Sequence, residues 1–195
     1  MARKPDLEEV ALRLVRVLGA DECVLVGGLA VGAHGYVRAT GDVDLIVKAS
    51  LESVRARLKR NGIRASLHRG DPTAGDFPCL KGTLAGVPFD IMPPLVPLDW
   101  RRAVRVPMRP EVTLPIVDLG GLIRLKLRAQ GPRDLLDVAA LVRRHPEELA
   151  AAREMSEAYG VADKLEVWLD DPRLEAEMPA RPPRRKRTAP RRGKP

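Results

Sequence analysis

Two aspartates, Asp42 and Asp44, stand at the start of the apolar run Leu45-Ile46-Val47. The run predicts a buried strand over residues 42–47, and residues at positions i and i+2 of a strand share one face. Two carboxylates on one face repel each other unless a cation lies between them. Mg²⁺ prefers oxygen ligands and commonly binds together with substrate phosphates. The pair therefore indicates a magnesium site, with two solvated aspartates at a strand edge as the alternative.

A third carboxylate, Asp90, interrupts the apolar run 87–92. A buried charge is costly unless it is paired or bound to metal. Asp90 is therefore either a salt-bridged acid at a strand end or the third ligand of a two-metal site, where two ions clamp the attacking and leaving oxygens of a displacement. Upstream, Gly27-Gly28 separates an apolar strand from a helix. Such glycines let the backbone approach a phosphate, although a Gly-Gly pair also forms ordinary turns.

The elements that must position these residues form a mixed α/β half followed by a helical half. Apolar periodicity and capping residues predict helices over 7–18, 29–34 and 51–60, and strands over 23–26, 42–47, 63–68, 80–84 and 87–92. Residues 93–115 are rich in proline, with a short helix expected over 99–104. From Asp118 to about residue 170 the pattern is helical, with breaks at Gly131-Pro132, His145-Pro146 and Gly160.

Composition limits the function further. Hydrophobic residues make up 45% of the chain and aromatic residues only 3%, which predicts an aliphatic core. We expect Cys23 and Cys79 to be packing residues of this core, and Trp100 and Trp168 likewise.

The net charge of +8 resides in residues 181–195, which contain eight basic residues and no acid. Of the 34 basic residues, 26 therefore remain to balance the 26 acidic ones. We expect a disordered basic tail over 179–195. No signal or membrane-spanning run is visible, so we expect a soluble, cytoplasmic protein.

The order strand, Gly27-Gly28, helix, Asp42-Val43-Asp44 on a strand and Asp90 on a later strand resembles the nucleotidyltransferase fold of the polymerase-beta superfamily. The resemblance implies a small mixed sheet with flanking helices over residues 1–115. It also implies that Asp42 and Asp44 hold Mg²⁺, with two ions in the site, and that Asp90 binds metal or acts as the base on the attacking hydroxyl. The family often has Gly-Ser where this chain has Gly27-Gly28.

The helical region, residues 116–178, adds to this resemblance. Its segment 122–141 resembles a signature of AbiEii-type toxins, in which a lysine is followed by an Arg/Lys-Asp pair and a further aspartate. By this resemblance Lys126 contacts the NTP phosphates, Asp134 orients Lys126 or lies near the base, and Asp137 supports the helix pair. The residues alone also allow Lys126 to snorkel to the surface and Asp134 to act only as an acid in the first turn of a helix.

Arg38 and Thr40 precede the aspartate pair in an Arg-x-Thr-x-Asp-x-Asp pattern that recurs in the family. Arginine is a bidentate phosphate donor, so both residues are candidate nucleotide ligands, with a solvated loop arginine as the alternative.

The leading hypothesis is a Mg²⁺-dependent enzyme that moves NMP from an NTP to a hydroxyl. The basic tail favours RNA as the acceptor, and a toxin-like member would have a cognate antitoxin. A small-molecule acceptor remains open, as does a non-catalytic, nucleotide-binding or antitoxin-like relative.

Overall fold

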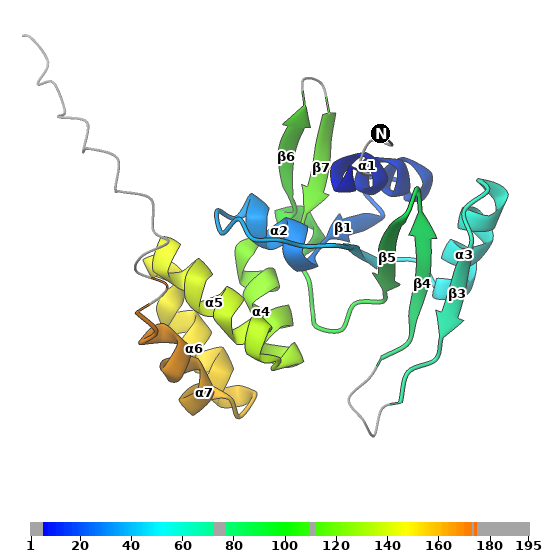
Figure 1. The fold of residues 1–195 in the computed structure, drawn as a ribbon. Helices are drawn as coiled ribbons and strands as arrows, with labels where there is room; N and C mark the ends of the chain where they lie inside the picture. Colours follow the sequence, from blue (N-terminus) through cyan, green and yellow to red (C-terminus); the bar gives the residue numbers. More distant parts are fainter. Residues whose placement is uncertain (1–5, 72–76, 110–111, 173, 175–195) are drawn as a thin grey trace, which may run out of the picture.

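The computed structural model describes residues 6–71, 77–109, 112–172 and 174. Its centre is a mixed sheet with the strand order β3-β4-β5-β2-β1-β7-β6 (Figure 1). The strands are β1 (Cys23–Leu25), β2 (Val43–Val47), β3 (Ala65–His68), β4 (Cys79–Leu84), β5 (Val87–Met92), β6 (Val104–Arg109) and β7 (Val112–Ile116). The helices are α1 (Leu7–Leu18), α2 (Gly27–Ala33), α3 (Leu51–Arg60), α4 (Leu119–Ala129), α5 (Pro132–Arg144), α6 (Leu149–Ala158) and α7 (Ala162–Leu169).

Helices α1 and α3 are amphipathic and pack against the sheet. The carboxylate of Asp6 accepts the Glu8 N–H at 3.0 Å and caps α1, and Ser50 caps α3 in the same way. The buried face of α1 consists of Val10, Ala11, Leu14, Val15 and Leu18. Helix α1 contacts β1, β2, β7 and α3, while α3 contacts β3 and β4. The two helices therefore cover much of the sheet with the aliphatic side chains that the composition predicted.

The middle of the sheet brings the acidic strands together. Strand β2 runs antiparallel to β1 and parallel to β5. In this register Asp44 lies directly opposite Asp90, because Val43 pairs with Phe89 and Leu45 with Ile91. Directly paired residues of neighbouring strands point to the same face of a sheet. The register thus places both carboxylates on one face at the centre of the sheet.

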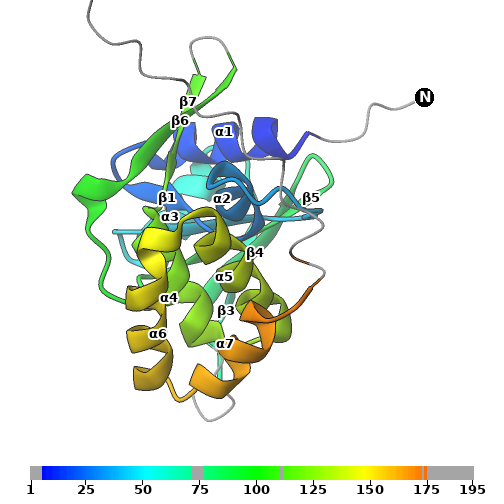
Figure 2. The same ribbon diagram turned by 90° about the vertical axis from the view of Figure 1, so that its left-hand side faces the viewer.

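Helices α4 to α7 form the C-terminal helical part, which lies against the sheet on one side of the molecule (Figures 1 and 2). Helix α5 buries one nearly continuous run from Asp137 to Val142, between α4, α6 and α7. The buried residues of the sheet half and of the helical part form one continuous hydrophobic cluster. Within the described residues, no helix has both the length and the apolar character needed to cross a bilayer.

Several predicted elements are confirmed and several are corrected. The passage 93–115 was expected to contain one short helix, but it forms a 3₁₀ turn at Trp100–Arg102 followed by strands β6 and β7. Gly27-Gly28 forms the first turn of α2 instead of preceding that helix. Residue 42 lies just before β2, not within it. The division at residues 115 and 116 stays a prediction, and the proposed disordered tail lies outside the described residues.

Candidate active site

Gly27 allows the chain to pass directly against the carboxylate of Asp44. Its φ of 61° lies in the left-handed region that favours glycine. A Cβ at this position would lie 1.9 Å from Asp44 Oδ2 and 2.9 Å from Asp44 Cβ. The backbone N–H of Val26 also donates to the carbonyl oxygen of Asp44 at 3.0 Å. The glycine therefore brings the turn from β1 to α2 to within contact distance of the strand carboxylate.

Gly28 lets the start of α2 pack closely against Thr40. A Cβ on Gly28 would lie 2.5 Å from Thr40 Oγ1. The Thr40 hydroxyl in turn donates to Asp42 Oδ1 at 2.9 Å. The Gly-Gly pair, Thr40 and both aspartates are thus in one small region, as the sequence predicted, and Thr40 orients a carboxylate in this structure.

The three carboxylates Asp42, Asp44 and Asp90 repel one another. Burial, and then the neighbouring charges of Asp42 and Asp90, raise the pKa of Asp44 to about 6. Asp90 is half-buried and forms an ion pair with Lys81 at 3.4 Å. Among the described residues, no set of three or more His, Cys, Asp or Glu side chains converges as a preformed metal cluster. Asp44 is therefore a largely buried carboxylate whose charge is opposed by two neighbours of the same sign.

A network of charged side chains lies beside Asp44, on α4 and α5. The Nζ atom of Lys126 is 2.7 Å from Asp134 Oδ1 and 3.0 Å from Asp137 Oδ2. Arg38 binds the fully buried Asp137 in bidentate fashion, with Nε–Oδ1 at 2.6 Å and Nη2–Oδ2 at 2.7 Å. Asp137 thus holds two cations at once, one from α4 and one from the loop between α2 and β2.

The contacts of three residues decide between the alternatives that the sequence left open. Arg38 is not a solvated loop arginine, because its side chain is 14% exposed and its pKa is raised, chiefly by the hydrogen bond to Asp137. Lys126 does not snorkel to the surface, since its side chain is 11% exposed and is held by two acids. Asp134 lies in the first turn of α5 and also pairs with Lys126, so capping is not its only contact. Whether Arg38 and Thr40 bind phosphate stays a prediction.

The loop between α2 and β2 is fastened to α5 at several further points. Arg133 donates to the carbonyl oxygen of Ala39 at 2.8 Å, and Arg144 donates to that of Gly35, also at 2.8 Å. The guanidinium of Arg144 also lies 4.9 Å from the centre of the Tyr36 ring, at the distance of a cation–π contact. The helical part therefore fixes the loop that leads into Asp42.

A cavity of about 190 Å³ opens between these elements. Four residues predicted from the sequence line it, namely Gly27, Asp44, Lys126 and Asp134. Its remaining wall is apolar and comes from the residue after β1, from β2, from the end of β5 and the loop after it, and from α4: Val26, Ile46, Met92, Leu95, Leu122, Leu125 and Ala129. The cavity thus combines two carboxylates and one ammonium with a hydrophobic surface.

Two features of this site go beyond what the sequence predicted. Asp137 was assigned only to the support of the helix pair, yet it is the acceptor for both Arg38 and Lys126. Its signal was present, because it is an acid within an apolar run of α5. The apolar wall contributed by Met92 and Leu95 was not predicted.

The fold is nucleotidyltransferase-like, and this likeness comes from solved structures. No protein-family model matches the chain, and no curated protein matches it in sequence. The crystal structure of ANT(2'')-Ia in complex with adenylyl-2''-tobramycin has a TM-score of 0.50 and 13% identity, over 77% of this chain and 97% of that chain.

Two further matches have lower scores and add no argument. The solution structure of the antibiotic-resistance factor ANT(2'')-Ia has a TM-score of 0.46 and 14% identity, over 82% of this chain and 94% of that chain. A Thermotoga maritima protein, provisionally assigned to the nucleotidyltransferases, has a TM-score of 0.43 and 14% identity, over 66% of this chain and 90% of its own.

Proposed function

We propose that this protein transfers a nucleoside monophosphate from an NTP to a hydroxyl group and releases pyrophosphate. The observation that carries the proposal is the meeting of Gly27, Asp44, Lys126 and Asp134 around one cavity, with Asp90 in register beside Asp44. These residues come from segments far apart in the sequence. The likeness of the fold to that of ANT(2'')-Ia supports the same reaction class.

Mg²⁺ fits the donor set of this site. Asp44 lies opposite Asp90, and Asp42 adds a carboxylate held by Thr40. Mutual repulsion of hard oxygen ligands is relieved by a divalent cation, and Mg²⁺ usually completes its coordination with water and substrate phosphates. We assign Asp42, Asp44 and Asp90 as the residues that would hold two ions. When bound, the ions would neutralise the phosphates and polarise the reacting phosphoryl group.

Each remaining residue has a role consistent with its contacts. Lys126 provides the positive charge for the phosphates, and Asp134 and Asp137 hold its ammonium in place. The apolar wall formed by Met92 and Leu122 would take the nucleobase. Asp90, which is half-buried and pairs with Lys81, is our candidate for the base that removes the proton from the acceptor hydroxyl.

For the acceptor, we propose RNA, in the manner of an AbiEii-type toxin with a cognate antitoxin. Two sequence features support this finer assignment: the signature over residues 122–141 and the tail with eight basic residues. ANT(2'')-Ia was solved with an adenylylated tobramycin, so a small hydroxylated acceptor is the alternative that the experiment must include.

The test is incubation with each labelled NTP, Mg²⁺ and either total cellular RNA or tobramycin. We expect label to enter RNA in the wild-type reaction and not in that of Asp44→Asn. Glu157→Gln is the matched control, because it removes an exposed acid on α6 and should keep full activity. If label enters tobramycin and not RNA, the proposed reaction stands, but the acceptor is a small molecule instead of RNA. If no acceptor is labelled and Mg²⁺–NTP does not protect the protein from unfolding, the transferase proposal is wrong.

A further inference from the structure

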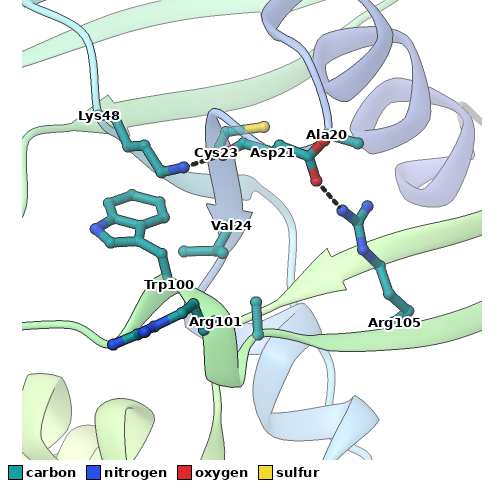
Figure 3. Close-up of a pocket in the computed structure, with 9 residues that line it drawn as sticks. Ala20, Asp21, Cys23, Val24, Lys48, Trp100, Arg101 and Arg105 are labelled. Carbon is teal, nitrogen blue, oxygen red and sulfur yellow. Dashed lines mark hydrogen bonds and ion pairs between the residues drawn. The ribbon is translucent and has the colours of Figure 1, made fainter.

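A second pocket, of about 330 Å³, lies at the other end of the central strands (Figure 3). It is lined by residues at the start of β1, just after β2, in the turn at Trp100–Arg102 and at the start of β6. Cys23, in its wall, pairs with Val47, whereas Asp44 lies beside the opposite end of β1. At about 3.3 Å per strand residue, the two sites are separated by on the order of 10 Å of strand. No residue is shared between them.

An indole ring forms one side of this pocket. Trp100 packs its ring against the hydrophobic core and also borders the pocket. The Lys48 ammonium lies 5.2 Å from the centre of this ring, a cation–π distance. Figure 3 shows Trp100 and Arg105 on opposite sides, with Val24 between them. Trp100 and Arg105 therefore border the pocket from two sides.

The charged groups around the pocket are surface side chains that already have partners. The Lys48 ammonium donates to the carbonyl oxygen of Asp21, and Arg105 pairs with the Asp21 carboxylate. Arg101, which is exposed and pairs with Asp99, adds a third cation, so the lining contains three basic side chains and one acid. The lining therefore carries a net positive charge, which favours an anionic group that competes with Asp21 for these cations.

We propose that this pocket binds one nucleotide unit, either a free nucleoside monophosphate or the 5′-phosphorylated end of an RNA strand. On binding, Lys48 leaves the face of the Trp100 ring and the base stacks there, as bases do on aromatic side chains in nucleic-acid-binding proteins. The phosphate is bound by Lys48 and Arg105, and an oxygen of Asp21 accepts a hydrogen bond from an exocyclic amine of the base. The volume is at the small end of the range for ligand pockets, which suits a single nucleotide.

The two tryptophans of the chain allow a test that does not involve the transferase reaction. In Trp168→Phe, Trp100 is the one remaining indole and reports on this pocket alone. We expect AMP to change its fluorescence saturably, with adenosine and inorganic phosphate each binding at least tenfold more weakly. The same titration in Trp168→Phe with Asp44→Asn should give the same affinity for AMP, because the carboxylate site is not part of this pocket.

Two pocket variants and one control complete the test. Arg105→Ala and Lys48→Met should each weaken AMP at least tenfold, while Arg55→Ala, which removes an exposed cation on α3, should not. Circular dichroism verifies that each variant is folded. A 5′-phosphorylated trinucleotide that binds at least tenfold more tightly than AMP identifies an RNA end, and equal affinity identifies a free nucleotide. The absence of a saturable change with either ligand, or equal binding by the pocket variants, overturns the proposal.

Discussion

Replacement of Asp44 by asparagine should stabilise the protein at neutral pH. The pKa of this carboxyl is raised from 3.8 to about 6, first by burial and then by Asp42 and Asp90. A difference of roughly two pH units corresponds to about 3 kcal/mol between the charged and neutral forms. Asparagine keeps the shape of the side chain and removes the charge. The gain in the free energy of unfolding should therefore approach about 3 kcal/mol above pH 7.

The sign of the pH dependence follows from the direction of the shift. Because the folded state holds the Asp44 proton more tightly than the unfolded state, stability falls as pH rises from about 4 to about 6, and the full penalty remains above that range. The advantage of Asp44→Asn should consequently disappear near pH 4. The charged Asp44 thus lowers the stability of the wild type at neutral pH, and a Mg²⁺ ion bound at the proposed metal site would offset this loss.

Urea unfolding followed by circular dichroism at pH 4.5, 6 and 7.5 measures this advantage directly, with Glu157→Gln as the control. We also expect Mg²⁺ to stabilise the wild type at pH 7.5 and to have little effect on Asp44→Asn, since ligands that bind only the native state add to its stability. An advantage that is absent at pH 7.5, or equal at pH 4.5 and 7.5, would refute the electrostatic argument. Stabilisation of both proteins by Mg²⁺ would remove Asp44 from the metal site.

Three further outcomes can be measured on single variants. Gly27→Ala should destabilise the protein by more than Gly62→Ala in thermal unfolding. Both glycines have a positive φ, which costs an alanine about 1–2 kcal/mol of backbone strain. Only at Gly27 would the new Cβ also clash with a carboxylate oxygen, 1.9 Å away. Arg38→Ala leaves the buried Asp137 with Lys126 as its remaining cation and should cost about 1.5–3 kcal/mol, whereas Arg105→Ala, in an exposed pair, should cost about 1 kcal/mol or less in urea unfolding. Burial raises the pKa of Cys23 to about 12, so this thiol should resist iodoacetamide at pH 8 until the protein unfolds, as mass spectrometry of the alkylated protein would show.

Local patterns predicted the elements whose signals are local. The helix predicted over residues 7–18 and the two strands predicted over residues 80–84 and 87–92 are confirmed as α1, β4 and β5. Strands β6 and β7 were missed because each contains a proline, Pro107 or Pro115, which argues against a strand. The structure accommodates both, because β6 is an edge strand and β7 meets β1 at a single paired position.

The sequence predicted which residues belong to the candidate site better than it predicted the bonds between them. Types and spacing singled out Asp44, and the resemblance to the AbiEii-type signature singled out Lys126 and Asp134; all three line one cavity. The bond from Arg38 to Asp137 was not predictable, because it joins residues 99 positions apart and depends on how α5 packs against the loop after α2. Hydrophobic periodicity predicts which face of a helix or strand a residue lies on. It does not predict which other element packs against that face.

The same long-range bond has a consequence for the order of synthesis. The ribosome makes Asp42, Asp44 and Asp90 well before Lys126, and Arg38 emerges 99 residues ahead of the carboxylate that binds it. A nascent chain that ends before α5 would carry the acidic strands and the Lys126 ammonium, but it would lack Asp137, which binds Arg38, and Asp134, which holds Lys126 together with Asp137. Completion of the candidate site is therefore tied to translation of α5.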